Sequence, residues 1–271
     1  MPNVNETVEV ARKVLPIIYV LDTSGSMSDD GKIDAVNEAM HETMEVLKDV
    51  SAKNPDAEIK VGVLKFSSGA SWVTSSGLVF MEDFYWNDLS AGGLTDVGSA
   101  LKELDQKLSR SAFLVSDTGF CIPVIMFMSD GQPTDDYEKA LSDITANNKW
   151  FKHATKIAIA VGDDADVEVL GKIAGNKEAV VSVQDVDTLK KLIKVASVTA
   201  SMINSKSRTT AEGNTAVEII KQTQTKLDDP DALTTNIDNS DPWTNWEKTD
   251  ASDTSDNSGS SWSSGDDDSW N

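Results

Sequence analysis

Three separated stretches of the sequence carry hydroxyl and carboxylate side chains of the kind that bind a hard metal ion. They are Asp22-Thr23-Ser24-Gly25-Ser26, Thr95-Asp96 and Ser129-Asp130-Gly131. The first follows an apolar run from Val14 to Leu21, the third follows a run from Ile122 to Met128, and both runs indicate buried strands. Thr95 comes after Gly92-Gly93 and opens a helical stretch. Because strand ends and a helix start can meet at one edge of a sheet, we expect these side chains to converge.

The residue types in these stretches favour magnesium, which prefers six oxygen ligands at about 2.1 Å. Ser24 and Ser26 are two residues apart in a turn, so both hydroxyls can face one point, and Thr95 can add a third hydroxyl from another loop. Asp22 and Asp130 supply negative charge. If they bind through water, the ion keeps a high effective charge and an open position for an outside carboxylate. Zinc, copper and iron are poor candidates, because no cysteine and no pair of histidines lies near these stretches.

Strand-like and helix-like stretches alternate along the first 203 residues. The expected strands are Val14 to Leu21, Glu58 to Phe66, Ala70 to Val73, Leu78 to Phe80, Val124 to Met128, Thr155 to Val161 and Ala179 to Val183. The apolar stripes of the expected helices begin at Ile33, Val97, Val167 and Leu189, and a more polar helix starts at about Asp136. Ser75-Ser76-Gly77 suits a hairpin turn between the two short strands. This alternation predicts an α/β fold, with a mostly parallel sheet covered by helices on both faces.

The composition is acidic along the whole chain. The net charge of the 271 residues is −21, with −12 before Asn204 and −9 from Asn204 onward. This charge argues against nucleic acid and anionic membranes as partners, since both require a positive face. No apolar stretch is long enough to span a membrane, and the first residues lack the features of a secretory signal. The single cysteine, Cys121, fits a reducing compartment and a buried, unreactive thiol, so we expect a cytoplasmic protein.

The character of the sequence changes at about Asn204, so we expect two parts: a folded domain over residues 1–203 and an acidic tail over residues 204–271. Within the tail, Thr215 to Thr225 is weakly helical, and from Asp228 the chain is rich in Asp, Ser, Thr and Asn. Such a composition cannot bury enough apolar surface to fold, so most of the tail is expected to be disordered. It nevertheless contains Trp243, Trp246, Trp262 and Trp270. Tryptophans among acidic residues indicate a short binding segment, while an inert solubilising tail is the alternative.

The three polar stretches together resemble the metal-ion-dependent adhesion site of the von Willebrand factor A domain family, over about residues 10 to 203. By this resemblance Ser24, Ser26 and Thr95 match the direct metal ligands, and Asp22 and Asp130 match those that bind through water. Asp96 matches a residue that supports the ligands from behind. The family implies a Rossmann-like three-layer fold, with a six-stranded sheet that has one antiparallel edge strand. It also implies Mg²⁺ or Mn²⁺, and protein binding through a partner's Glu or Asp instead of catalysis.

Within that family the chain resembles bacterial cytoplasmic proteins near the TerY group of tellurite-resistance operons. The resemblance rests on Leu15-Pro16, Asp22 to Met27, Ala35-Val36-Asn37-Glu38 and Leu94 to Gly98. It implies a role in a stress response or a phosphorylation-linked system, with a protein kinase and a phosphatase encoded nearby. This chain departs from some relatives because it lacks a cysteine-rich zinc segment at the C-terminus; the acidic tail stands in its place.

Two alternatives to the metal-dependent adaptor remain open. In the first, the tryptophan-bearing tail is the main partner-binding element, and it binds either a partner or the chain's own metal site. In the second, the chain is a magnesium-dependent phosphohydrolase. The phosphohydrolase is disfavoured because His41 and His153 are isolated in the sequence and give no acid/base pair. We therefore expect that the chain is not an enzyme. Asp163-Asp164-Ala165-Asp166 resembles part of a calcium loop but suits a helix cap better. Trp72 is expected to pack, and the role of Trp86 is left open.

Overall fold

Seven strands, seven α-helices and three short 3-10 helices make up the part of this computed structural model that is described, residues 11–74, 77–206 and 215–228. The strands are β1 (Lys13–Asp22), β2 (Ala57–Ser67), β3 (Gly69–Trp72), β4 (Val79–Phe80), β5 (Val124–Ser129), β6 (Thr155–Val161) and β7 (Val180–Val183). The α-helices are α1 (Lys32–Lys53), α2 (Val97–Lys107), α3 (Tyr137–Asn147), α4 (Lys149–His153), α5 (Val167–Ala174), α6 (Val186–Lys206) and α7 (Thr215–Asp228). The 3-10 helices are η1 (Gly25–Gly31), η2 (Met81–Asp83) and η3 (Lys177–Ala179).

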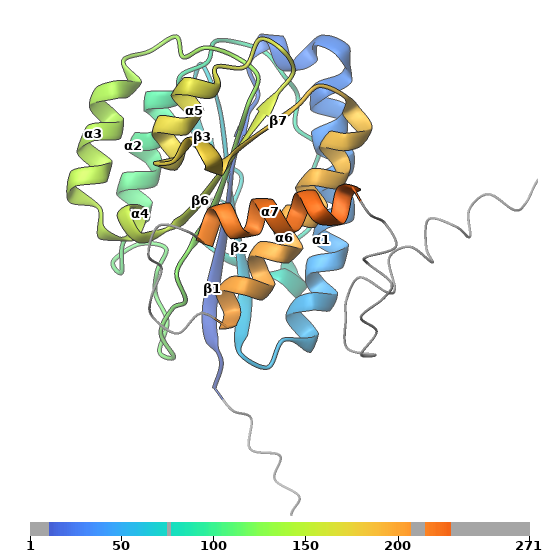
Figure 1. Ribbon diagram of the computed structural model, residues 1–271. Coiled ribbons are helices and arrows are strands. Elements are labelled where there is room, and N and C mark those ends of the chain that lie inside the picture. Colours follow the sequence, from blue (N-terminus) through green and yellow to red (C-terminus); the bar gives the residue numbers. More distant parts are fainter. Residues whose placement is uncertain (1–10, 75–76, 207–214, 229–271) are drawn as a thin grey trace, which may run out of the picture.

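The sheet separates two layers of helices, as the sequence predicts. Figure 1 shows α1, α6 and α7 on one side of the sheet, and α2, α3, α4 and α5 on the other. The strand order is β3-β2-β1-β5-β6-β7, and the five strands from β2 to β7 in this order run parallel to one another. The central position of β1 explains its unbroken apolar run, because every residue from Val14 to Asp22 is buried.

The sheet has seven strands instead of the expected six, and the difference lies at the edge beside β2. β3 and β4 both pair antiparallel with β2 and not with each other, so one edge position is divided between two short strands. The expected hairpin between them is therefore wrong; the tight turn instead joins β2 to β3 at Gly69, whose φ of +86° permits the reversal. Between β3 and β4 the Thr74 hydroxyl accepts the Val63 backbone N–H at 3.1 Å, which satisfies a donor of β2 that no strand partner reaches.

Helices α1 and α6 cover one face of the sheet because their apolar stripes face it. Met40, Met44 and Leu47 of α1 are buried, at the three- and four-residue spacing that the sequence shows. Two ion pairs join the helices, from Lys190 to Glu38 and from Lys194 to Glu42. These contacts hold α1 against the sheet, and so hold the loop that joins β1 to α1.

The region assigned to the tail contains a packed helix. The expected boundary between residues 203 and 204 falls inside α6, which continues to Lys206. The weakly helical stretch is α7, which packs along α6 and buries Val217, Ile219 and Ile220. Its burial explains why a polar sequence forms a helix here, since tertiary packing supplies stability that propensity lacks. The residues from 229 onward, with the four tail tryptophans, lie outside the described residues. No helix among the described residues is long and apolar enough to cross a membrane.

Candidate metal centre

The three polar stretches converge at the carboxyl edge of the sheet. β1 ends at Asp22, β5 ends at Ser129, and Thr95 lies just before the first turn of α2. Two backbone hydrogen bonds join the first two loops, from Gly25 N to the Gly93 carbonyl at 3.1 Å and from Gly92 N to the Thr23 carbonyl at 2.8 Å. The prediction that strand ends and a helix start meet at this edge is confirmed.

Glycine is required at Gly93 because the turn between β2 and β3 lies directly beside it. Its φ is +94°, and a Cβ there would lie 2.8 Å from the Ser68 hydroxyl. At Gly25, a Cβ would lie 3.4 Å from the Gly93 carbonyl, which is ordinary contact. The second loop is therefore packed closely against the turn between β2 and β3, while the first loop is in ordinary contact with the second.

Three hydroxyl groups face a common region. The Ser24 and Ser26 oxygens are 3.2 Å apart. Neighbouring ligands of an octahedral magnesium ion are separated by roughly 3.0 Å, given metal–oxygen distances of about 2.1 Å. A Cβ built on Gly131 would lie 3.5 Å from Thr95 Oγ1 and 3.7 Å from Ser26 Oγ, so both hydroxyls border one small space. The spacing of the two serine oxygens therefore fits a small hard cation, and the Thr95 hydroxyl borders the same space.

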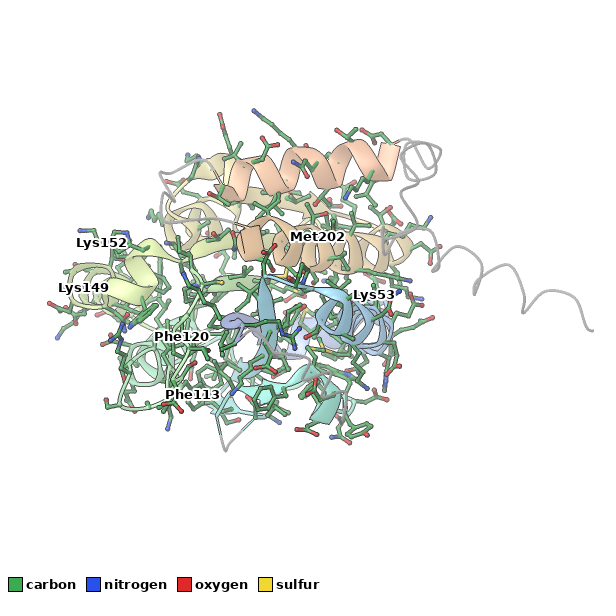
Figure 2. All side chains as sticks on the ribbon, turned by 90° about the horizontal axis from the view of Figure 1, so that it is seen from below. Lys53, Phe113, Phe120, Lys149, Lys152 and Met202 are labelled. Atoms are coloured by element: carbon green, nitrogen blue, oxygen red, sulfur yellow. The ribbon has the colours of Figure 1, made fainter. Side chains whose placement is uncertain are left out.

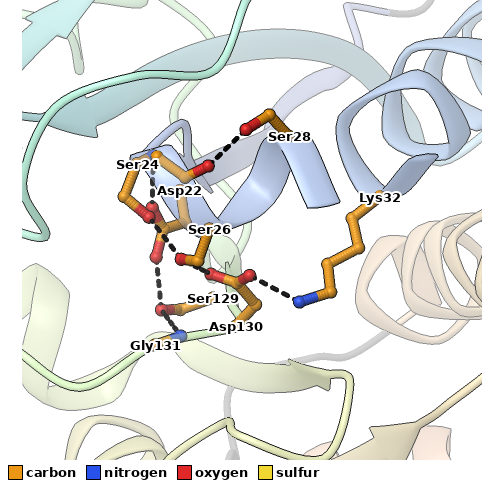
Figure 3. A network of polar contacts seen from close by, with 9 residues as sticks. Asp22, Ser24, Ser26, Ser28, Lys32, Ser129, Asp130 and Gly131 are labelled. Atoms are coloured by element: carbon orange, nitrogen blue, oxygen red, sulfur yellow. Dashed lines mark hydrogen bonds and ion pairs between the residues drawn. The ribbon is translucent and has the colours of Figure 1, made fainter. Parts of the chain in front are cut away.

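The Asp22 carboxylate is buried and fully hydrogen-bonded. It accepts the Ser24 backbone N–H on Oδ1 at 2.8 Å and the Ser129 hydroxyl on Oδ2 at 2.5 Å (Figure 3). Burial raises the pKa of Asp22 and nearby Asp130 adds to the rise, whereas the hydrogen bonds from Ser129 and Ser24 lower it. A cation close by would favour the charged form of this carboxylate. Asp22 therefore shapes the first loop and supplies charge at the same time.

The second carboxylate, Asp130, joins the site to α1 through an ion pair that the sequence did not point to. Its Oδ1 accepts the Ser26 hydroxyl at 2.8 Å, and its Oδ2 accepts the Lys32 ammonium at 2.8 Å (Figure 3). The Asp130 side chain has no exposed surface and that of Lys32 is 14% exposed. Gly162 leaves the space for this lysine, since a Cβ there would lie 3.3 Å from Lys32 Nζ. Only the fold brings the first residue of α1 onto a carboxylate 98 positions away.

Asp96 and Thr134 fix the position of the Thr95 loop through hydrogen bonds. Asp96 accepts the Gly69 backbone N–H at 2.7 Å and the Thr134 hydroxyl at 3.0 Å. The Thr134 hydroxyl in turn accepts the Thr95 N–H at 2.9 Å, and the Thr134 N–H donates to the Thr95 carbonyl at 2.9 Å. Asp96 therefore supports the loop as the resemblance implies. Thr134 was missed, because a threonine four residues after Asp130 carries no signal of its own.

The donor set distinguishes among metals. Among the described residues, no group of three or more His, Cys, Asp or Glu side chains converges to hold an ion. A metal at this edge would depend on hydroxyl oxygens and two carboxylates, a set that suits Mg²⁺ or Mn²⁺ better than zinc.

Ser24 and Asp130 are each only 1% exposed, whereas Leu94, beside Thr95, is 56% exposed. The centre therefore lies just below the surface, with an exposed apolar side chain at its border.

The remaining candidate residues lie in other environments. His41 contacts Asp88 at 2.9 Å on the exposed side of α1, and His153 ends α4. Asp166 caps α5 by accepting the N–H groups of Glu168 and Val169, as expected for the Asp-rich stretch. The tryptophans pack: Trp72 meets the Phe113 ring at 4.6 Å between ring centres, and Trp86 is buried at 7% exposure.

The fold agrees with the comparisons to known proteins. The family model for the von Willebrand factor type A domain matches residues 17–195, from within β1 to within α6. The chain belongs to the von Willebrand factor type A domain family. A search of curated proteins finds no significant match.

Solved structures share this fold at low sequence identity. A von Willebrand factor type A protein from Catenulispora acidiphila is 21% identical, with a TM-score of 0.50 over 70% of this chain and 43% of that one. The ArnB paralog VWA2 from Sulfolobus acidocaldarius is 16% identical, with a TM-score of 0.50 over 69% of this chain and 46% of that one. Proximal thread matrix protein 1 from the mussel byssus is 18% identical, with a TM-score of 0.50 over 68% and 47%. The chain thus spans less than half the length of each of these proteins.

Proposed function

We propose that this chain is a metal-dependent protein-interaction module. Domains of this family are common protein-interaction modules. In the proposal Ser24, Ser26 and Thr95 bind Mg²⁺ or Mn²⁺ directly, and Asp22 and Asp130 bind it through water. The observation that carries the proposal is the convergence of three hydroxyls from two loops beside two buried carboxylates.

The proposed partner offers a Glu or Asp side chain to the metal. A dication held mainly by neutral hydroxyls keeps a high effective charge and attracts a further anionic oxygen. The site lies next to exposed Leu94, so a partner that reaches the metal also contacts an apolar side chain. The chain's net charge of −21 repels an acidic protein as a whole, so the carboxylate must come from a partner whose surrounding surface is not acidic.

The proposal is for binding and not for catalysis. Water activation at a metal needs a general base within hydrogen-bond reach. The two histidines of the chain do not provide one. His41 lies on α1 beside Asp88, and His153 ends α4 just before β6 begins, away from the carboxyl edge. We also propose the finer setting that the resemblance suggests, a bacterial cytoplasmic adaptor in a TerY-like system that works beside a protein kinase and a phosphatase.

Metal titration tests the proposal directly. Calorimetry of the purified chain with MgCl₂ and with MnCl₂ should show saturable uptake, and the double variant Ser24→Ala with Thr95→Ala should lose it. Ser28→Ala is the matched control, since the Ser28 hydroxyl is exposed and donates only to the Gly25 carbonyl. Uptake that is equal in all three proteins, or absent from the wild type, would contradict the proposal.

Partner binding is tested separately from metal uptake. Bacterial lysate is passed over the immobilised chain in Mg²⁺ and in chelator, and the captured proteins are identified. Proteins that bind only in Mg²⁺, and only to chains with Ser24 and Thr95 intact, support the adaptor role. Capture that is unchanged by chelator and by Asp22→Ala with Ser24→Ala would remove the metal centre as the docking point.

A further inference from the structure

A basic cavity lies at the end of the sheet opposite the metal centre. It has a volume of about 280 Å³ and is bounded by α4, the start of β6, the end of α5 and the start of α7. Figure 2 views this end of the molecule and shows Lys149 and Lys152 projecting from α4. The described residues that line the cavity include Lys152, His153, Lys156 and Lys172, and none of these described residues is an aspartate or glutamate. Such a basic lining is unexpected in a chain that has 45 acidic and 24 basic residues.

The lysines are only partly neutralised within the described part of the chain. Lys156 donates to the carbonyls of Phe151 and Ala154 at 3.0 and 3.4 Å, and its partial burial lowers the pKa of its ammonium. Lys172 reaches Glu138 at 3.4 Å, with both side chains well exposed, so that pair is weak. Lys152 lies in the last turn of α4, where the helix carbonyls favour a cation. No carboxylate among the described lining residues balances these charges inside the cavity.

The start of α7 adds to the positive potential. Thr215 and Ala216 line the cavity and begin this 14-residue helix, and the start of a helix carries partial positive charge. Three lysines, a histidine and this helix end therefore face one space, which suits an anionic ligand.

We propose that this cavity binds the chain's own acidic segment, residues 229–271, through the segment's aspartates. The segment has 11 acidic residues and a single basic one, so its charge is opposite to that of the cavity. Lysine ammonium groups are also attracted to the faces of tryptophan rings, and the segment carries four tryptophans. The inference goes beyond the proposed metal-dependent function, since it involves the other end of the sheet and requires no metal.

The segment is long enough to reach the cavity. It follows Asp228 at the far end of α7, roughly 21 Å along the helix from Thr215 at a rise of 1.5 Å per residue. Its 43 residues extend several times that distance at about 3.3 Å each. Because the segment is covalently attached, its effective concentration at the cavity is in the millimolar range, so weak contacts suffice.

A spin label on the segment tests the proposal in the full chain. The variant Cys121→Ala with Ser263→Cys carries a nitroxide, and amide signals are recorded by NMR in chelator at low salt. We expect selective broadening of amides beside the cavity, such as those of Gly175 and Asn176, and its loss at high salt. The double variant Lys152→Glu with Lys172→Glu should lose this broadening. The control variant Lys102→Glu with Lys139→Glu, which changes two exposed lysines of α2 and α3, should keep it.

Four results would overturn the proposal. They are broadening that is absent from the wild type, broadening that persists in the Lys152→Glu and Lys172→Glu variant, broadening centred on Leu94 and Gly131, and cavity shifts caused only by added inorganic phosphate. The third would mean that the segment covers the metal centre, and the fourth that the cavity takes a free anion. None of the four bears on metal uptake, so this proposal and the proposed function fail independently.

Discussion

Replacing Lys32 with methionine separates the role of the ammonium from that of the metal. In the structure this ammonium is 2.8 Å from Asp130 Oδ2, and the carboxylate has no exposed surface. Lys32→Met keeps the apolar stem of the side chain and removes only its charge. Without a metal, Asp130 then remains buried with one hydrogen bond, from the Ser26 hydroxyl at 2.8 Å.

The expected loss of stability can be estimated from this geometry. Removing one partner of a buried ion pair costs about 3–5 kcal/mol. For Lys32→Met the loss of unfolding free energy should be smaller, roughly 2–3 kcal/mol. The reason is that Lys32 is 14% exposed and Asp130 keeps its hydrogen bond from the Ser26 hydroxyl. In a domain of this size 1 kcal/mol corresponds to about 2–4 °C, so we expect the variant's Tm in chelator to fall by roughly 4–12 °C.

Magnesium should reverse most of this loss. A dication bound beside Asp130 replaces the missing positive charge, and removal of Lys32 removes its repulsion of the ion. Ligand at one hundred times its Kd stabilises a protein by about 2.7 kcal/mol, and a tighter-binding variant gains more at the same concentration. The variant should therefore show a larger rise in Tm on addition of MgCl₂ than the wild type does.

Differential scanning calorimetry in EDTA and in MgCl₂ measures both effects. Lys53→Met is the control, because it breaks an exposed pair with Asp49 and should change Tm little in either medium. A fall in Tm for Lys32→Met that is the same in EDTA and in MgCl₂ would refute the reasoning, since Asp130 would then have no connection to a metal. A variant as stable as the wild type in EDTA would refute the electrostatic account of the ion pair.

Three further predictions test the surroundings. Gly162→Ala places a Cβ at φ +81° and 3.3 Å from Lys32 Nζ, so denaturant unfolding should show a loss of at least about 1–2 kcal/mol, and no loss would show that the loop relaxes freely. Asn148→Ala removes the cap of α4 and the amide bonds to Asp105 and Leu108, and should cost about 2–4 kcal/mol; a loss below 1 kcal/mol, roughly, would contradict the role of this amide. Burial raises the pKa of the Cys121 thiol, so alkylation at pH 8 should be slow until denaturant is added, and rapid labelling of the folded chain would contradict its burial.

The sequence alone determined the elements and the edge at which the chemistry lies. Local hydrophobic periodicity depends only on neighbours, so it predicted β6 at Thr155–Val161 with the bounds that the structure has, and a helix that begins at Val167, where α5 begins. It also placed Asp22 and Asp130 at strand ends, and parallel strands bring such ends to one edge. The residue types then restricted the expected cation to a hard one. These inferences need no knowledge of distant contacts.

Only the tertiary structure decided which distant groups meet. No local pattern shows that β3 and β4 share one edge of β2, since pairing depends on where Gly69 and Thr74 let the chain turn. The ion pair of Lys32 with Asp130 is decided by the packing of α1 beside Gly162. The burial of α7 is likewise decided by the apolar surface that α6 leaves beside it. Each of these contacts joins residues far apart in the chain, and their free energy exists only once the intervening elements have packed.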